Sequence, residues 1–244
     1  MAQVFGERSK YLIWMDYASR IAAILVYIMF LYTLYSYISI NFTKTASVLS
    51  ILVATAMYLP LILWIKKELG NYIRSAFNFR IGRIAEYEIC DELSNNLSED
   101  FLIFQDVKIG GKIGNIDLVV IGKNGAFALE VKSHSGKMTF NGFNLLRNDF
   151  NFREKNVLKQ TMDEAVDLSN HIKNKTGKYY FIEPVLVFSS KWAFMRFGFN
   201  KIKGVHVVQK RFLNELILRS PECLTNEDVE FLKKELIELV HVKN

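Results

Sequence analysis

Two carboxylates and one lysine stand in a mostly apolar part of the sequence: Asp117, Glu130 and Lys132, within NIDLVVIGKNGAFALEVKS at 115–133. A Mg²⁺ ion takes oxygen ligands, commonly one or two carboxylates together with waters and a substrate phosphate. Such a metal lowers the pKa of a bound water and neutralises charge that develops on a phosphodiester. Lys132 could orient that water or stabilise the charge of the transition state. These residue types are therefore suited to metal-assisted phosphodiester chemistry.

The stretch has the pattern of two strands joined by a turn, and the register of this hairpin decides which charges face each other. If the loop is 122–125 or its inner pair, Asp117 lies opposite Glu130. If Asn124-Gly125 is the two-residue turn, as its composition favours, Asp117 faces Lys132 and Glu130 is diagonal. Because side chains alternate along a strand, both registers place all three charges on the same face.

The same three residues have a plainer interpretation. Groups of opposite charges are common on exposed sheet faces, and a solvated salt bridge would use the same residue types. The neighbours on both arms are neutral and apolar, including Ile116, Val119, Phe127 and Leu129. Those surroundings favour a functional site over a solvated face.

Short strands and amphipathic helices surround the hairpin. Positions 66–100 are expected to be helical with a break at Gly82, and a second hairpin is expected across Asn141-Gly142. The last helix is expected to begin at Thr225, with Asp228 as its capping partner. Further strands and one more helix are expected at 101–109, 182–190, 204–209 and 153–174. The order predicts an α/β domain with a mixed central sheet flanked by helices.

This order of elements and residues resembles the PD-(D/E)XK nuclease superfamily, with its restriction-endonuclease-like fold, and more narrowly the NERD (nuclease-related) domain. The resemblance covers roughly 81–208. It rests on GRIAEYEI with Glu86, on the hairpin, on Gly136 just after it, on KNVLKQ with Gln160, and on the strand PVLVF. Ile116 stands where the superfamily name suggests proline.

The resemblance implies a metal-dependent phosphodiesterase that cuts DNA. By that resemblance, Asp117, Glu130 and the backbone carbonyl of Val131 would hold Mg²⁺, and Mn²⁺ would substitute for it. Lys132 would position the attacking water. The hairpin would thus supply both the metal ligands and the residue that orients the nucleophile.

Two helical residues complete the implied site. Glu86 would reach the metal directly or through water from the first helix, and Gln160 would support the site from the later helix. Both residue types are ordinarily solvated on a helix, and only the resemblance selects them. Basic residues around the hairpin could follow a phosphate backbone without sequence preference; those predicted to bind nucleic acid are Lys112, Lys137, Arg147, Arg153 and Lys159.

The segment KWAFMRFGF at 191–199 interleaves aromatic residues with Lys191 and Arg196. Such a segment could stack nucleic-acid bases, lie in a membrane interface, or pack beneath the terminal helices. Packing is the ordinary interpretation of aromatic residues at this density.

The first 65 residues differ in character, because Lys44 is the only charged residue from Ile21 to Ile65. Segments of 20 and 19 residues, at 21–40 and 47–65, would each span roughly 30 Å as a helix, the thickness of a bilayer's hydrocarbon core. We predict a transmembrane hairpin in a membrane anchor at 1–66, a helical connector at 67–80 and a nuclease domain at 81–244. Two buried helices of a soluble core are the alternative, although such helices carry a polar face.

Basic residues flank the two predicted spans on their outer sides, while the connecting turn holds only Lys44. The positive-inside rule therefore places both termini and the nuclease domain in the cytoplasm, at the cell (inner) membrane. The net charge of +6 is compatible with polyanionic partners. Cys90 and Cys223 have no CxxC spacing, which excludes a zinc ribbon and fits a reducing compartment.

The sequence thus predicts a membrane-anchored, Mg²⁺-dependent nuclease. Its expected partners are nucleic acid, with DNA as the preferred kind, and the lipid bilayer. Defence against incoming DNA is a role suggested by the pairing of anchor and nuclease. The alternative keeps the fold without the chemistry, as a module that tethers nucleic acid or binds proteins within a larger membrane complex or homo-oligomer. The presence of all four residues Glu86, Asp117, Glu130 and Lys132 favours the enzyme.

Overall fold

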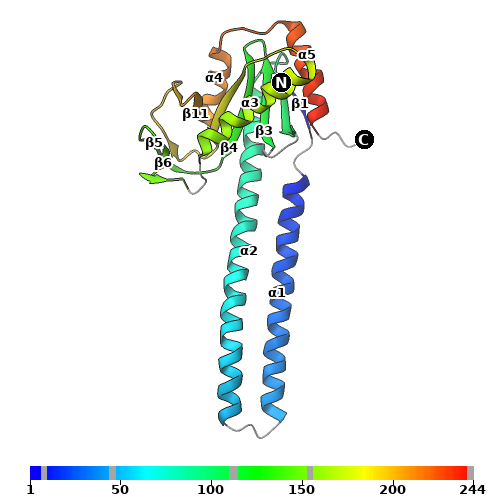
Figure 1. Ribbon diagram of the computed structural model, residues 1–244, viewed down its shortest axis with the longest axis vertical. Coiled ribbons are helices and arrows are strands. Elements are labelled where there is room, and N and C mark those ends of the chain that lie inside the picture. The colour runs from blue at the N-terminus through cyan, green and yellow to red at the C-terminus, as the bar shows by residue number, and fades with distance from the viewer. Residues whose placement is uncertain (7–9, 44–47, 110–114, 153–155, 241–244) are drawn as a thin grey trace. The chain divides into compact units, whose positions relative to one another are not determined.

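A computed structural model describes residues 1–6, 10–43, 48–109, 115–152 and 156–240 of the chain (Figure 1). Between residues 10 and 69 it describes only some of the side chains. The internal contacts divide the chain into two compact units: Lys10–Ile81 forms one, and Met1–Ser9 together with Gly82–Asn244 forms the other. All the residues of the predicted site belong to the second unit.

Two long helices form most of the chain up to Asn96: α1 (Lys10–Thr43) and α2 (Val48–Asn96). Helix α2 continues without interruption through Gly82, so the predicted break at this residue is wrong. An isolated glycine inside a helix costs only about 1 kcal/mol relative to alanine, which the helical residues on both sides offset. The last part of α2 belongs to the second unit, where it carries Glu86.

The membrane prediction concerns α1 and the first part of α2. Within the described residues, no helix combines the length and the apolar composition needed to cross a membrane. Residue 47 and most side chains of the predicted span at 47–65 lie outside the described part of the chain. The apolar side chains that are described in α1 are largely exposed, among them Ile21, Leu25 and Ile28.

A mixed seven-stranded sheet forms the centre of the second unit, as the α/β prediction required. The hairpin with the predicted site residues is in its middle: β3 pairs antiparallel with β2 and β4, whereas β4, β8 and β11 are parallel neighbours. Strand β1, which sequence analysis did not predict, pairs in parallel with β2. In spatial order the strands are β1 (Gln3–Phe5), β2 (Leu102–Val107), β3 (Ile116–Gly122), β4 (Gly125–Lys132), β8 (Ile182–Phe188), β11 (Val205–Gln209) and β10 (Lys201–Ile202).

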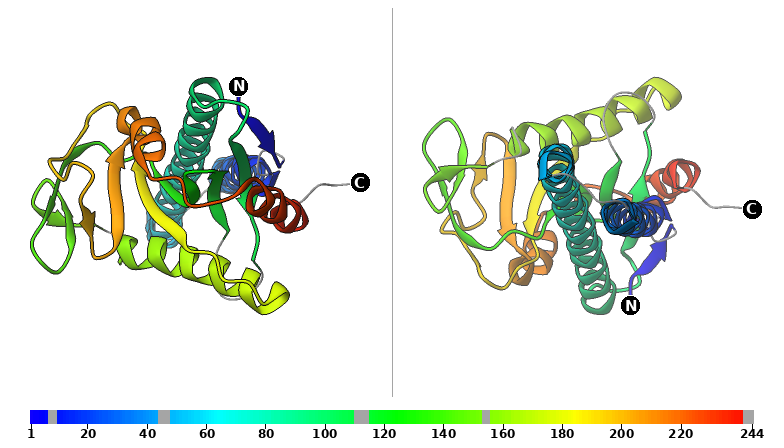
Figure 2. Two further views of the ribbon diagram at one scale, coloured as in Figure 1. Left: turned by 90° about the horizontal axis from the view of Figure 1, so that it is seen from above. Right: turned by 90° about the horizontal axis from the view of Figure 1, so that it is seen from below.

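Helices cover both faces of this sheet (Figure 2). The last part of α2 and helix α4 pack on the face that carries Leu118, Val120 and Leu129. Helices α3 and α5 pack on the opposite face, which carries Val119 and Ala128. Strands β3 and β4 are therefore buried on both sides. The bounds of these helices are α3 (Val157–Thr176), α4 (Leu213–Arg219) and α5 (Asn226–Leu239), with a short 3-10 helix η1 (Lys210–Phe212) before α4.

A smaller four-stranded sheet extends from the end of β4 and contains the second predicted hairpin. Strands β5 and β6 pair antiparallel around the Asn141-Gly142 turn, so this prediction is confirmed. The predicted cap of the last helix is also confirmed, because Thr225 and Asp228 form a reciprocal capping box on α5. The strands of the small sheet, in spatial order, are β7 (Phe150–Asn151), β6 (Leu145–Arg147), β5 (Gly136–Phe140) and β9 (Ala193–Phe194).

The hairpin register places Gly122 opposite Gly125, so that Lys123 and Asn124 form the turn. The Asn124-Gly125 turn favoured by composition is therefore wrong. Gly125 instead begins β4 with a φ of 124°, a conformation that glycine adopts without a steric penalty. The side-chain amide of Asn124 donates to the carbonyls of Leu218 (3.3 Å) and Ser220 (2.6 Å), at the end of α4.

We expect Asn124→Ala to lower the free energy of unfolding by about 1–2 kcal/mol, because the carbonyls of Leu218 and Ser220 lose their donor. Urea denaturation of the natural protein and of Asn124→Ala measures this difference in the free energy of unfolding. Asn200→Ala, at an exposed loop position, is the matched control and should change the free energy by less than about 0.5 kcal/mol. Equal midpoints for Asn124→Ala and the natural protein would contradict the assigned role of the turn.

Candidate active site

The hairpin brings its three charged side chains together on the face covered by α3. The observed register, extended by one pair, places Asp117 opposite Glu130. The ammonium of Lys132 lies 2.9 Å from Oε1 of Glu130, and the backbone N–H of Val131 donates to Oδ2 of Asp117 over 2.7 Å. Glu130 is buried, with 4% of its surface exposed. One carboxylate of the pair is thus compensated by a lysine and the other by a backbone amide.

Helix α3 adds a glutamine and a second glutamate to this cluster. The side-chain amide of Gln160 donates to Oε1 of Glu130 over 3.0 Å and to Oε1 of Glu164 over 2.9 Å. Glu164 is 1% exposed. Sequence analysis missed Glu164, although its spacing of four residues from Gln160 places both on one side of a helix. Gln160 therefore joins the hairpin to a carboxylate that the sequence motif does not contain.

Glu86 approaches the cluster from α2. Burial, followed by the negative charges of Asp106 and Glu130, raises the pKa of Glu86 to about 7. The positive charge of Lys132 opposes this rise. The carboxyl of Glu86 therefore interacts electrostatically with Glu130 and with Lys132.

Burial also dominates the ionisation of the two other perturbed carboxyls. It raises the pKa of Asp117 well above its ordinary value, and the charges of Glu130 and Glu86 raise it further. For Glu164, burial and then the charge of Glu130 raise the pKa to about 8. Their proximity thus favours the neutral forms of these acids, and a bound cation would favour the charged forms instead.

The donor set of the hairpin is suited to a hard cation, because Asp117 and Glu130 present carboxylate oxygens that repel each other. Among the residues that the structure describes, no group of three or more Asp, Glu, His or Cys side chains is arranged to hold a metal ion. Magnesium sites commonly use only one or two protein carboxylates, with waters and substrate phosphate as the other ligands. Asp117 and Glu130 satisfy that smaller requirement. A direct ligand role for Glu86 and a role for the Val131 carbonyl stay predictions.

The predicted nucleic-acid contacts are scattered. Lys112 and Arg153 lie outside the described residues. Lys137 is exposed on β5, whereas Arg147 is partly buried and donates from Nε to the carbonyl of Ser135 over 2.6 Å. Lys159 forms an ion pair with Asp163 one turn along α3. Of the described candidates, Lys137 and Lys159 are exposed, and Lys159 shares its charge with Asp163.

Residues 81–189 match the model of the NERD family, the nuclease-related domain. This stretch begins in the last part of α2 and ends just after β8, so it contains Glu86, the hairpin, Gln160 and Glu164. Comparison with curated proteins gives no match, and comparison with solved structures gives none either. The match supports a nuclease-related domain over these residues and nucleic acid as its class of partner.

In metal-free buffer, we expect the midpoint of thermal unfolding to fall as the pH rises from about 5 to 8. Glu86 and Glu164 have folded-state pKa values of about 7 and about 8, above the ordinary value of 4.5. At these two groups the folded protein therefore binds protons more tightly than the unfolded chain. The stability that they contribute is complete below about pH 4.5 and is lost as the pH rises through the folded-state values, and it outweighs the opposite effect of His206, whose pKa is lowered by burial. Differential scanning fluorimetry across this range measures the effect.

Glu164→Gln should flatten this pH dependence, because a neutral amide replaces one of the groups that must ionise. Glu99→Gln, at an exposed position before β2, is the control and should keep the slope of the natural protein. A midpoint that rises between pH 5 and 8, or a slope that Glu164→Gln leaves unchanged, would contradict the electrostatic description of the cluster.

Proposed function

We propose that this protein is a membrane-anchored, metal-dependent nuclease that hydrolyses phosphodiester bonds of DNA. The observation that carries the proposal is the hairpin pair of half-buried Asp117 and buried Glu130, with the ammonium of Lys132 2.9 Å from Glu130. Two facing carboxylates that share one lysine are stabilised in their charged forms by a further positive group. A cation bound together with a phosphodiester is such a group.

Each residue of the cluster has a distinct task in this proposal. Asp117 and Glu130 would hold Mg²⁺, which, when bound, polarises the phosphodiester and lowers the pKa of a water. Lys132 orients the attacking water and stabilises negative charge that develops on the phosphate. Gln160 fixes the position of Glu130 by donating to its Oε1. Glu86, with a pKa of about 7, can hold or release a proton at neutral pH.

The first test is cleavage of plasmid and single-stranded DNA by the full chain with Mg²⁺ or Mn²⁺. Asp117→Ala and Lys132→Ala should each lower the rate by at least about 100-fold, since each removes a group that acts on the reacting phosphate. Lys123→Ala, in the turn at the other end of the same hairpin, is the matched control and should keep the natural rate. In the absence of DNA, Mg²⁺ should raise the unfolding midpoint at pH 8 in the natural protein but not in Asp117→Ala.

A different result has a definite interpretation. If the natural protein binds DNA without cutting it under any metal, the proposal of an enzyme is wrong and a tethering module is the better description. If cutting persists at an undiminished rate in Lys132→Ala, the hairpin is not the active site.

The membrane anchor rests on the two apolar segments of the sequence at 21–40 and 47–65 and on the exposure of apolar side chains in α1. Such exposure is unfavourable in water unless another apolar medium covers it. We place both termini and the nuclease domain in the cytoplasm, because basic residues flank the outer ends of both segments. An anchor would restrict cutting to DNA near the membrane, which suits defence against incoming DNA. The role fails if incoming and chromosomal DNA are cut alike, without dependence on the anchor.

Ile28→Lys combined with Leu31→Lys should shift the protein from the carbonate-resistant membrane fraction to the soluble or aggregated fraction. Each lysine near the centre of a span costs about 2.5–3.5 kcal/mol on the insertion scale. Tyr72→Lys combined with Ile73→Lys, in exposed positions of α2 outside the predicted spans, is the control and should leave the fractionation unchanged. Equal carbonate extraction of the two double variants would contradict the anchor.

A further inference from the structure

The segment that follows β8 separates its residues into an outward and an inward set. Ala193, Met195 and Phe197 point into the protein, where they pack in one hydrophobic cluster. The residues between them are exposed: 61% of Trp192 and 56% of Phe194 are accessible, and Arg196 is exposed as well. Packing therefore explains only every second residue of this segment. The two large outward rings require another explanation.

Basic side chains surround the two rings. Strand pairing places Lys137 of β5 beside Phe194 of β9, so both lie on the outer face of the small sheet. The ammonium of Lys191 lies 5.2 Å from the centre of the Trp192 ring. Together, Lys137, Lys191, Trp192, Phe194 and Arg196 are termed the aromatic surface.

The surroundings of the aromatic surface are predominantly basic. Residues 133–152 and 184–214, which include the small sheet and its connections, contain eight lysine or arginine residues and a single acidic residue, Asp149. A polyanion would therefore meet mainly positive charge from these segments. This one-sided composition contrasts with the rest of the chain, where acidic and basic residues are mixed.

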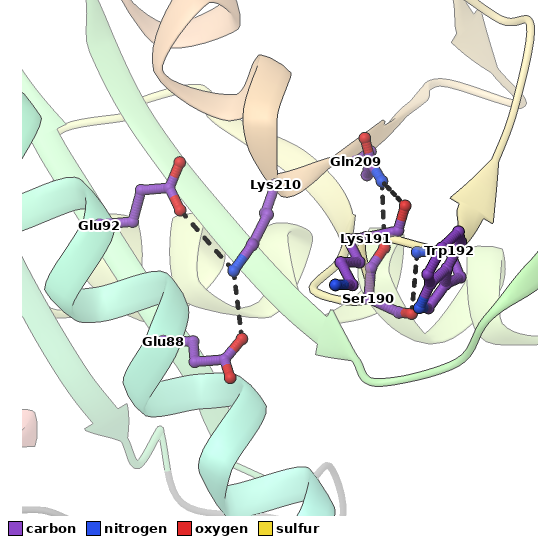
Figure 3. A network of polar contacts seen from close by, with 7 residues as sticks. All are labelled: Glu88, Glu92, Ser190, Lys191, Trp192, Gln209 and Lys210. Carbon is purple, nitrogen blue, oxygen red and sulfur yellow. Dashed lines mark hydrogen bonds and ion pairs between the residues drawn. The ribbon is translucent and has the colours of Figure 1, made fainter.

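A buried glutamine holds the turn that carries Trp192 (Figure 3). Gln209 is 4% exposed, and its amide nitrogen donates to the carbonyls of Ser190 (3.1 Å) and Lys191 (3.0 Å). The backbone N–H of Trp192 donates to Oγ of Ser190 over 3.2 Å. The next residue, Lys210, forms ion pairs with α2 through Glu88 and Glu92 (Figure 3). Trp192 is thus presented from a fixed backbone, which lowers the entropy lost when its ring binds a partner.

The aromatic surface is directly connected to the candidate active site. The backbone N–H of Ser189 donates to the carbonyl of Lys132 over 3.0 Å, where β8 and β4 end side by side. Four residues after Lys132, the N–H of Gly136 donates to the carbonyl of Trp192 over 2.8 Å. Gly136 has a φ of 107°, which allows the chain to turn from β4 into β5. Two consecutive backbone bridges therefore link the reactive lysine to the exposed rings.

We propose that the aromatic surface binds single-stranded nucleic acid and guides it to the hairpin site. Bases stack on Trp192 and Phe194, which project from one face at alternate positions, while Lys137, Lys191 and Arg196 contact the phosphates. That the bound nucleic acid continues to the hairpin site rests on the proposed nuclease function. A duplex hides its base faces in its own stack, so only an unpaired strand gains from the rings.

Binding of fluorescently labelled single-stranded (dT)20 to the full chain, measured by anisotropy in EDTA, tests the inference. Trp192→Ala combined with Phe194→Ala should raise the Kd for (dT)20 at least about tenfold, while the Kd for a duplex of equal length should change less than about threefold. Trp192→Phe should retain most of the affinity, because it keeps a ring for stacking. Lys191→Ala and Arg196→Ala should each reduce the salt dependence of log K by about 0.7.

The matched control is Tyr179→Ala combined with Phe181→Ala. These two rings have the same spacing and are each 61% exposed, but they precede β8, whereas Trp192 and Phe194 follow it. This variant should bind (dT)20 like the natural protein. Unfolding midpoints equal to that of the natural protein exclude a folding defect in either double variant. Should the Trp192/Phe194 variant misfold, the comparison of Trp192→Phe with Trp192→Leu decides instead, with weakening expected only for leucine.

The outcomes separate this inference from the proposed function. Unchanged (dT)20 binding in the Trp192/Phe194 variant overturns the inference, even where the natural protein cuts DNA. Loss of (dT)20 binding by that variant supports the surface even where no metal induces cutting, and in that case the nuclease proposal alone fails. Binding to vesicles of phosphatidylcholine and phosphatidylserine is the remaining comparison. If the Trp192/Phe194 variant loses vesicle binding but still binds (dT)20, the rings contact a lipid surface, and the inference is also overturned.

Discussion

The repulsion between Asp117 and Glu130 is the constraint on which the rest of the domain depends. The hairpin register places the two carboxylates opposite each other in the interior of a sheet, where like charges facing across strands are destabilising. The protein compensates with groups from several elements: a lysine of the same strand, a backbone amide and a glutamine of α3. Each of these groups is held by the packing of its own element. The site thus exists only in the assembled domain.

The layers of the fold follow from the same requirement. Strands β3 and β4 are apolar on both faces and need helices on each side, and those helices bring the polar partners of the hairpin with them. Helix α3 covers the charged face and supplies Gln160 and Glu164. Helix α2 brings Glu86 into the electrostatic field of the cluster. The packing of the helices on the sheet therefore also assembles the site, because the helices that exclude water from the hairpin carry Gln160, Glu164 and Glu86.

Sequence reasoning found the parts of the site that depend on local pattern. The alternation of a strand placed Asp117, Glu130 and Lys132 on one face whatever the turn, and their contacts agree with this. The register of the hairpin could not be predicted from local sequence. The side chain of Asn124 in the observed turn donates hydrogen bonds to carbonyls more than ninety residues further along the chain. Glu164 was missed because a glutamate in an amphipathic helix ordinarily faces solvent. Strand β1 was missed because three residues carry too short a pattern, and its partner lies about a hundred residues later.

The turn between β3 and β4 also has a consequence for the order in which the folded chain is completed. Besides the bonds of Asn124, the carbonyl of Lys123 accepts from the backbone N–H groups of Cys223 and Leu224. The segment that secures the turn is therefore translated about a hundred residues after the hairpin itself. A growing chain has the sequence of its hairpin before it has these contacts, and a chain that lacks residues 218–224 has none of them. The observed turn is thus completed by residues that are synthesised well after the two strands it joins.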